Sequence, residues 1–144
     1  MSRERAALLL AVRPRFAEAI LSGTKTVEVR RRRVGAAEGS PVVLYASSPI
    51  MAIVGTARLE CTETWPIDEA WQMYGHTMGI SEVEFNDYLD GSRVACLLFL
   101  SNAAALGNPL SLNHPRNGRL FHPPQSYRYV GPSDPRSLRN LVRQ

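Results

Sequence analysis

The chain has 144 residues, of which 44% are hydrophobic, enough for one domain with a buried core and too few for two ordinary domains. No run of about eighteen apolar residues is present, and the apolar stretch 6–12 is too short, and too soon followed by Arg13, to be a signal peptide. We therefore expect a single domain spanning residues 1–144, located in the cytoplasm and without a membrane segment.

The charge of +4 is unevenly distributed along the chain. Residues 1–33 carry nine Lys or Arg against three Glu, a net charge of +6, and residues 93–144 carry seven Arg against one Asp, also +6. Residues 59–92 carry eight acids and no Lys or Arg, a net charge of −8. If the basic ends meet, they form a surface that attracts a polyanion, and the acidic segment either faces elsewhere or screens it. The alternative is a solvated surface on which arginines are simply scattered.

The first predicted elements are a strand and a helix. Residues 6–12 form a continuous apolar run that is typical of a buried central strand. Pro14 then suits the first turn of a helix, and Phe16, Ala19 and Ile20 recur on one helical face. Because Gly23 follows the last periodic residue, where a glycine commonly ends a helix, we expect a helix over residues 14–22.

A charged strand follows this helix. Val27 and Val29 alternate with Glu28, Arg30 and Arg32, a pattern that sends the valines to a core and the ions to the opposite face.

Lys25, just before this strand, is the single lysine in a chain with sixteen arginines. An amine can lose its proton when buried, whereas a guanidinium practically cannot, so Lys25 is a candidate for a chemically distinct role. A solvated strand start with a chance lysine is the alternative.

The next segment is predicted to form a β-hairpin. Residues 42–45 and 50–59 are its strands, and residues 46–49 form a tip of small polar residues. Gly55 lies inside the second strand, where glycine suggests a bulge or a barrel bend. Ser47 and Ser48 in the tip either bind a phosphate or a base, or satisfy their own turn.

The acidic segment is predicted to form a helical insert. One helix covers residues 67–74, and a second begins after Ser81, which forms a capping box with Glu84. An apolar strand over residues 93–100 follows, and it is expected to be central.

The last part of the chain alternates between irregular and regular segments. Residues 102–124 are rich in Gly, Pro and Asn, and we expect them to be mostly irregular with a short extended piece near residues 110–112. The final strand covers residues 126–130 and a short terminal helix covers 135–142. Five to six strands, an early helix and a helical insert indicate an α+β fold, a partly closed β-barrel whose function belongs to a cleft at its rim.

Several familiar site types are absent from the sequence. It contains no phosphate-binding loop, no dinucleotide-binding glycine motif, no HExxH and no GxSxG. His76, His114 and His122 have no Cys or acid at metal-ligand spacing and are expected to be surface residues. Cys61 and Cys96 are expected to be buried and reduced. We therefore expect no metal and no cofactor.

The sequence resembles the ASCH (activating signal cointegrator homology) family, whose fold is the PUA-like β-barrel. The residues that carry this resemblance are Arg13-Pro14, the block Ile20–Arg32 with its pattern G-x-K-T-x-E-x-R, the turn Leu44–Pro49, Ile53–Gly55, Gly79–Glu82 with Phe85 and Tyr88, and Pro123–Tyr129. They extend over nearly the whole chain.

The resemblance implies a cleft beneath the first helix that suits RNA or a nucleotide-like ligand. Some members are hydrolases that remove the acyl group from acetylcytidine through a Lys, Thr and Glu set, and others bind or cleave RNA. Lys25 matches the lysine, but Glu28 stands in the place of the threonine, and residues 76–78, in the region of the glutamate, offer no carboxylate. The amidohydrolase set is thus only partly matched.

We therefore expect an RNA- or nucleotide-binding domain with a basic cleft around the charged strand. The candidate binding residues are Arg13, Arg15, Lys25, Glu28, Arg30, Arg32, Ser47, Ser48, Gln125, Ser126 and Tyr127. The arginines would neutralise phosphates and Tyr127 or Tyr129 would stack on a base, while Glu28 either accepts from a base or forms an internal salt bridge. One alternative is a small hydrolase of RNA or of a modified nucleoside that uses Lys25 and Glu28. Another is a regulatory domain that binds an unknown protein through the insert.

Overall fold

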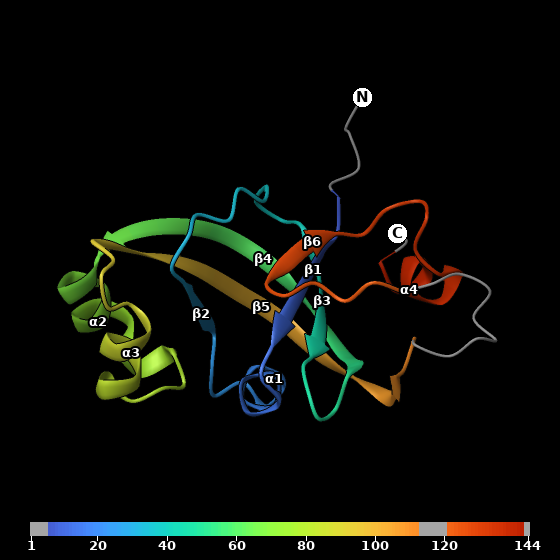
Figure 1. The fold of residues 1–144 in the computed structure, drawn as a ribbon, viewed down its shortest axis with the longest axis horizontal. Coiled ribbons are helices and arrows are strands. Elements are labelled where there is room, and N and C mark those ends of the chain that lie inside the picture. Colours follow the sequence, from blue (N-terminus) through green and yellow to red (C-terminus); the bar gives the residue numbers. More distant parts are fainter. Residues whose placement is uncertain (1–5, 113–120, 143–144) are drawn as a thin grey trace.

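The computed structural model describes residues 6–112 and 121–142. Its strands are β1 (Leu8–Val12), β2 (Val27–Arg30), β3 (Pro41–Ala46), β4 (Ala52–Pro66), β5 (Val94–Leu110) and β6 (Tyr127–Tyr129). Its helices are α1 (Pro14–Ser22), α2 (Ile67–Tyr74), the short 3-10 helix η1 (Gly75–Thr77), α3 (Glu82–Tyr88) and α4 (Arg136–Leu141). Figure 1 shows α2 and α3 at one end of the sheet, α4 at the other, and α1 between them.

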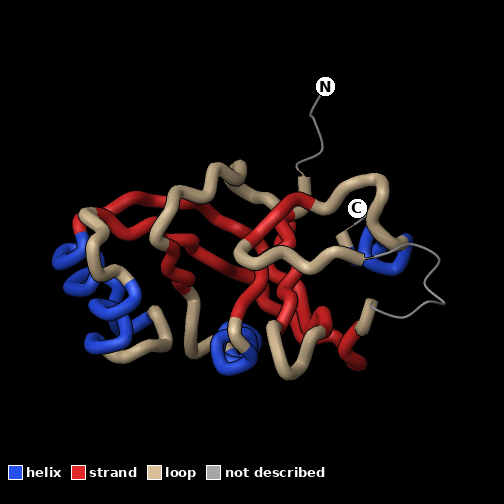
Figure 2. The backbone as a smooth tube through the Cα atoms, viewed as in Figure 1, coloured by secondary structure: helices blue, strands red, loops and turns tan. Residues whose placement is uncertain are grey.

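The strands form one six-stranded sheet in the order β2-β5-β4-β3-β1-β6. β1 pairs in parallel with β3, and the other neighbours are antiparallel. The long strands β4 and β5 bend along their length and curl the sheet into a half-barrel (Figures 1 and 2). This confirms the expected α+β class and the partly closed barrel.

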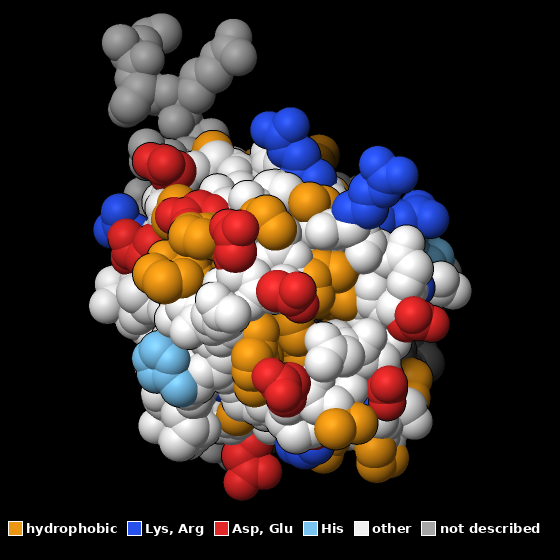
Figure 3. All heavy atoms as spheres, turned by 90° about the vertical axis from the view of Figure 1, so that its left-hand side faces the viewer, with side chains coloured by type: hydrophobic (Ala, Val, Ile, Leu, Met, Phe, Trp, Pro, Cys, Tyr) orange, Lys and Arg blue, Asp and Glu red, His pale blue; other side chains and the backbone are white. Residues whose placement is uncertain are grey.

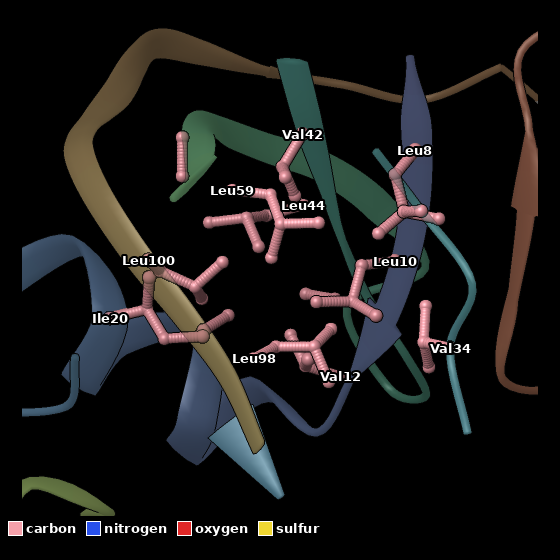
Figure 4. Packing of buried hydrophobic residues seen from close by; sticks show 14 of the residues in the cluster. Leu8, Leu10, Val12, Ile20, Val34, Val42, Leu44, Leu59, Leu98 and Leu100 are labelled. Atoms are coloured by element: carbon pink, nitrogen blue, oxygen red, sulfur yellow. The ribbon is translucent and has the colours of Figure 1, made fainter. Parts of the chain in front are cut away.

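β1 is buried on both faces, which explains its continuous apolar sequence. Leu8, Leu10 and Val12 belong to the core cluster beneath α1, whose packing appears in Figure 4. Leu9 and Ala11 point to the other side, into a second cluster that contains Leu138 of α4. A strand between two cores needs apolar residues at every position, because period-two alternation suits a sheet with one solvated face.

A third core cluster joins the helical insert to the sheet. Val27 and Val29 of β2 pack there with Phe85 of α3 and Met78 from the turn before it. The helices predicted at residues 67–74 and after Ser81 are confirmed, and Ser81 and Glu84 form the expected capping box. The valines of the charged strand thus face a core, as the alternation predicted.

Two strands are longer than the sequence indicated. β4 continues seven residues past Leu59 to Pro66, and β5 continues ten residues past Leu100 to Leu110. The expectation that residues 102–124 are mostly irregular is therefore wrong for 102–110, and residues 113–120, with His114, lie outside the described part. β5 accommodates its Asn and Gly residues by register shifts against β4, and Asn102 adopts a positive φ of 52°.

The predicted hairpin is present as β3 and β4, and Gly55 lies at one of its irregular positions. Register shifts flank this residue against both neighbouring strands. A Cβ atom at Gly55 would lie 2.5 Å from Leu21 Cδ2 and 2.7 Å from the carbonyl oxygen of Ala104. Glycine is required here because strand and helix approach too closely for a side chain.

Cys61 and Cys96 are both free thiols, as expected, although Cys61 is only half-buried. Within residues 6–112 and 121–142, no helix is long and apolar enough to cross a membrane.

Candidate functional site

A pocket of about 820 Å³ opens where α1, β2 and α3 meet the segment before β6. Its lining consists of Ala11, Val12, Arg13, Phe16, Lys25, Glu28, Val29, Arg30, Ser47, Ile80, Glu84, Asp87, Tyr88, Pro124, Gln125 and Ser126. Seven of the predicted binding residues are among them: Arg13, Lys25, Glu28, Arg30, Ser47, Gln125 and Ser126. Its volume is in the range of pockets that hold nucleotide-sized ligands.

Lys25 lies at the base of this pocket and is 1% exposed. α1 ends at Ser22, and Gly23 directly after it has a φ of 87°, which turns the chain so that the amide of Lys25 donates back to the carbonyl oxygen of Ala19. The Lys25 ammonium donates to the carbonyl oxygens of Val27 and Met78 and lies 3.2 Å from Glu28 Oε1. An ammonium has three hydrogens, so these three acceptors satisfy it completely.

Burial sets the electrostatics of this amine. It lowers the pKa of Lys25 from its ordinary value of 10.5, and the carboxylate of Glu28 opposes that shift. Phe16 adds a further contact, with Lys25 Nζ 4.9 Å from the centre of its ring. Lys25 is therefore a buried and fully bonded group, unlike a lysine at a solvated strand start.

Glu28 stands between two cations and is itself 5% exposed. Its Oε1 faces Lys25, and its Oε2 accepts from Arg30 Nε at 3.0 Å and from Arg30 Nη2 at 2.6 Å. The ions of β2 do point away from its valines, but Glu28 is buried beneath the pocket and not solvated. The internal salt bridge that the sequence left open thus forms, both with Lys25 and with Arg30.

Arg30 connects β2 with β1 and with the segment before β6. Its Nη2 donates to the carbonyl oxygen of Ala11 at 2.8 Å, and its Nη1 donates to Ser126 Oγ at 2.9 Å. The amide of Ala11 also donates to the carbonyl oxygen of Ser126 at 2.9 Å. Arg30 therefore fixes one wall of the pocket as well as the carboxylate of Glu28.

The remaining predicted residues lie apart from this cluster. Arg32 and Ser48 are exposed and do not line the pocket. Tyr127 is half-buried and packs against the core cluster beneath α1. Arg15 does not line the pocket either, but it forms an exposed ion pair with Glu84, a lining residue of α3. That hydrogen-bonded pair raises the pKa of Arg15 and lowers the pKa of Glu84.

Sequence reasoning missed the wall that α3 provides. The pocket is lined by Glu84, Asp87 and Tyr88 of α3 and by Ile80 just before this helix. The sequence had allowed the acidic segment either to face away from the basic surface or to screen it, and named none of these residues as a binding residue. Figure 3 views the end of the molecule that carries α2 and α3 and shows acidic side chains spread among apolar ones. The capping box located the helix, but only tertiary packing brings it to α1.

No group of three or more potential metal-binding side chains occurs in the part of the chain that the structure describes. The pocket itself offers an ion cluster, carboxylates, and hydroxyl and amide groups.

Comparison with known proteins identifies relatives of nearly full length. A family model described as "Domain of unknown function (DUF365)" matches residues 6–115. An ASCH domain-containing ribonuclease of Zymomonas mobilis is 31% identical over 142 residues, which cover 98% of this chain and 95% of that protein.

Solved structures agree with this relationship. The crystal structure of ASCH from Zymomonas mobilis has a TM-score of 0.85 at 31% identity and covers 97% of this chain and 98% of that one. The crystal structure of a tyrosine-to-phenylalanine variant of the protein from that organism also has a TM-score of 0.85, at 30% identity. This match covers 96% of this chain and 100% of that one. Sequence and structure agree over almost the whole length, and the chain belongs to the ASCH family.

Proposed function

We propose that this protein binds single-stranded RNA and holds one nucleotide in the pocket between α1, β2 and α3. The observation that carries the proposal is the buried cluster of Lys25, Glu28 and Arg30 at the base of that pocket. Two cations and one anion leave a net positive charge with little access to water, which favours a single phosphate nearby. The similarity to an ASCH domain-containing ribonuclease supports RNA as the polyanion.

The other groups around the pocket suit a nucleotide. Arg13 is exposed at the rim and is available to neutralise a phosphate, and Gln125 and Ser126 offer hydrogen-bonding groups. Phe16 and Tyr88 provide apolar surface for a base, which single-stranded RNA presents unstacked. The pocket therefore combines charge for the backbone with apolar surface for the base.

The salt dependence of binding tests this proposal. With a fluorescein-labelled RNA octamer, log K should fall with log[salt] with a slope of roughly −2 to −4, because three to five phosphate contacts contribute about 0.7 each. Arg13→Gln should make the slope shallower by about 0.7. Arg136→Gln, an exposed residue of α4 outside the pocket, is the matched control and should leave the slope unchanged. An RNA affinity that does not change with salt concentration, or no binding at low salt, would contradict the proposal.

A second candidate function is cleavage of the bound RNA, which the name of the Zymomonas relative favours. In such a cleavage a ribose 2′-oxygen bonds to the adjacent phosphorus, and the bond from phosphorus to the 5′-oxygen breaks. A base takes the proton of the 2′-hydroxyl, and an acid supplies a proton to the 5′-oxygen. Glu28 is a candidate for that base because it lines the pocket, although it is 5% exposed and both of its oxygens contact a cation.

Incubation of end-labelled RNA with the wild type and with Glu28→Gln separates binding from cleavage. Products that appear with wild type and vanish with Glu28→Gln, while the variant still binds RNA and unfolds cooperatively, support a ribonuclease. RNA that stays intact in both samples leaves binding as the function.

A further inference from the structure

Three carboxylates line the pocket, and two of them already have partners. Glu28 bonds to Lys25 and Arg30, and Glu84 pairs with Arg15 and accepts from Ser81. Asp87 differs from both. Among the residues that the structure describes, no hydrogen bond or ion pair reaches its side chain, and it is exposed at the pocket wall. Asp87 is thus the carboxylate that can accept hydrogen bonds from a ligand.

The position of Asp87 is not one that stabilises its helix. Asp87 lies in the last turn of α3, near exposed carbonyl groups, where the helix dipole disfavours a negative charge. The stabilising acids of this helix are Glu82 and Glu84 in the first turn, and Glu84 completes the capping box. Loss of the Asp87 charge should therefore cost the fold nothing, which separates its role in binding from any role in stability.

The surroundings of Asp87 are suited to a flat ring. Tyr88 follows it and is 42% exposed, and Ile80 and Phe16 continue the apolar part of the same lining. The cations of the pocket lining, Arg13, Lys25 and Arg30, all lie outside α3. A nucleotide whose phosphate faces these arginines can present the edge of its base to α3.

We propose that Asp87 recognises the Watson–Crick edge of a guanine, an inference that rests on the proposed RNA function. Guanine carries two neighbouring donors on that edge, N1–H and the N2 amino group, and a carboxylate accepts from both with its two oxygens. Cytosine and adenine offer one amino donor beside a ring nitrogen that is an acceptor, and uracil offers one N3–H between two carbonyl oxygens. The free carboxylate therefore ranks guanine first and uracil last.

Competition with mononucleotides tests the assignment. Guanosine, cytidine, adenosine and uridine 5′-monophosphates are each titrated against the labelled RNA octamer bound to the intact protein. Guanosine monophosphate should compete at least about fivefold better than uridine monophosphate, since one well-placed bidentate contact discriminates by about five- to a hundred-and-fiftyfold. Asp87→Asn replaces one acceptor oxygen by a donor and should reduce that ratio to about one, with an unchanged melting temperature.

Asp90→Asn is the matched control, because Asp90 is exposed just beyond α3 and does not line the pocket. It should keep the guanine preference. If wild type binds the octamer but shows no guanine preference, or if Asp87→Asn keeps it, the assignment of Asp87 fails and RNA binding stands. If wild type does not bind the octamer at all, the proposed function fails and this inference fails with it.

Discussion

The ammonium of Lys25 has an acceptor for each of its hydrogens inside the protein, so it has none left for a ligand. Its stem also packs under Gly79, where a Cβ atom would lie 3.0 Å from Lys25 Cβ and where φ is +67°. In this geometry Lys25 acts through Glu28, by fixing the carboxylate that in turn orients Arg30. The side chain is a positioning residue of the pocket.

Both Lys25→Ala and Lys25→Arg should destabilise the protein. Lys25→Ala leaves Glu28 buried with one cation fewer, and breaking a buried pair in this way typically costs about 3–5 kcal/mol. Lys25→Arg keeps the charge, but a larger planar guanidinium cannot reproduce the three contacts of the ammonium with Val27, Met78 and Glu28. The protein should therefore be less stable, and RNA binding should weaken nearly as much as with alanine. Urea denaturation and RNA titration measure the two effects.

Arg32→Ala serves as the control for Lys25, because Arg32 is exposed and outside the pocket, and its stability should match that of wild type. A Lys25→Arg variant with the stability and RNA affinity of wild type would show that Lys25 contributes only a charge.

Part of this cluster could be predicted from the sequence. A single lysine among sixteen arginines marked Lys25 as distinct, and the spacing of Glu28 and Arg30 allowed an ion pair on one face of a strand. The carbonyl of Met78, by contrast, is 53 residues away along the chain. The residues next to Lys25 in the sequence do not determine which distant turn packs against its side chain, so the burial of Lys25 could not be predicted.

Among the elements, β4 is sensitive to a small substitution at Gly55. Gly55→Ala would place a methyl group against a Leu21 methyl and the Ala104 carbonyl oxygen, and the backbone oxygen cannot move aside as the leucine can. Overpacking of this kind costs about 1–3 kcal/mol. The free energy of unfolding should fall by that amount in urea titrations.

Gly107→Ala on the partner strand β5 is the matched control for Gly55. No atom lies within 4 Å of a Cβ built there, so stability should be unchanged or slightly increased. Equal stability of the two variants would contradict a close approach of α1 and β5 to Gly55.

Elements with strong local signals were predictable, and those that depend on pairing were not. α1 carried a proline at its start and a glycine after its end, and β1 carried an uninterrupted apolar run. The second half of β5 has no such signal, because Gly107, Asn108 and Pro109 are typical of loops. It is a strand because β4 is long enough to pair with it around bulges.

For the whole molecule, the resemblance to acetylcytidine hydrolases leads to a negative expectation. Their Lys, Thr and Glu set has only its lysine here, and that lysine is buried with its hydrogens bonded, while both oxygens of Glu28 are bound to cations. We predict no efficient deacetylation of acetylcytidine, since neither Lys25 nor Glu28 is free to act as the activated nucleophile or as its base. Chromatography of acetylcytidine incubated with the protein checks this, and Lys25→Ala gives the background rate. Rapid turnover by wild type alone would contradict it.

The pairing of β1 with β6 has a consequence for synthesis of the protein. Leu8 near the start of the chain pairs with Tyr129 near its end, and the wall of the pocket at Ser126 is held by Arg30. During translation the charged strand leaves the ribosome long before its partner segment. A nascent chain that stops short of residue 126 therefore has an ion cluster but an incomplete pocket. Full affinity for RNA should arise only once residues 126–129 have been synthesised and β6 pairs with β1.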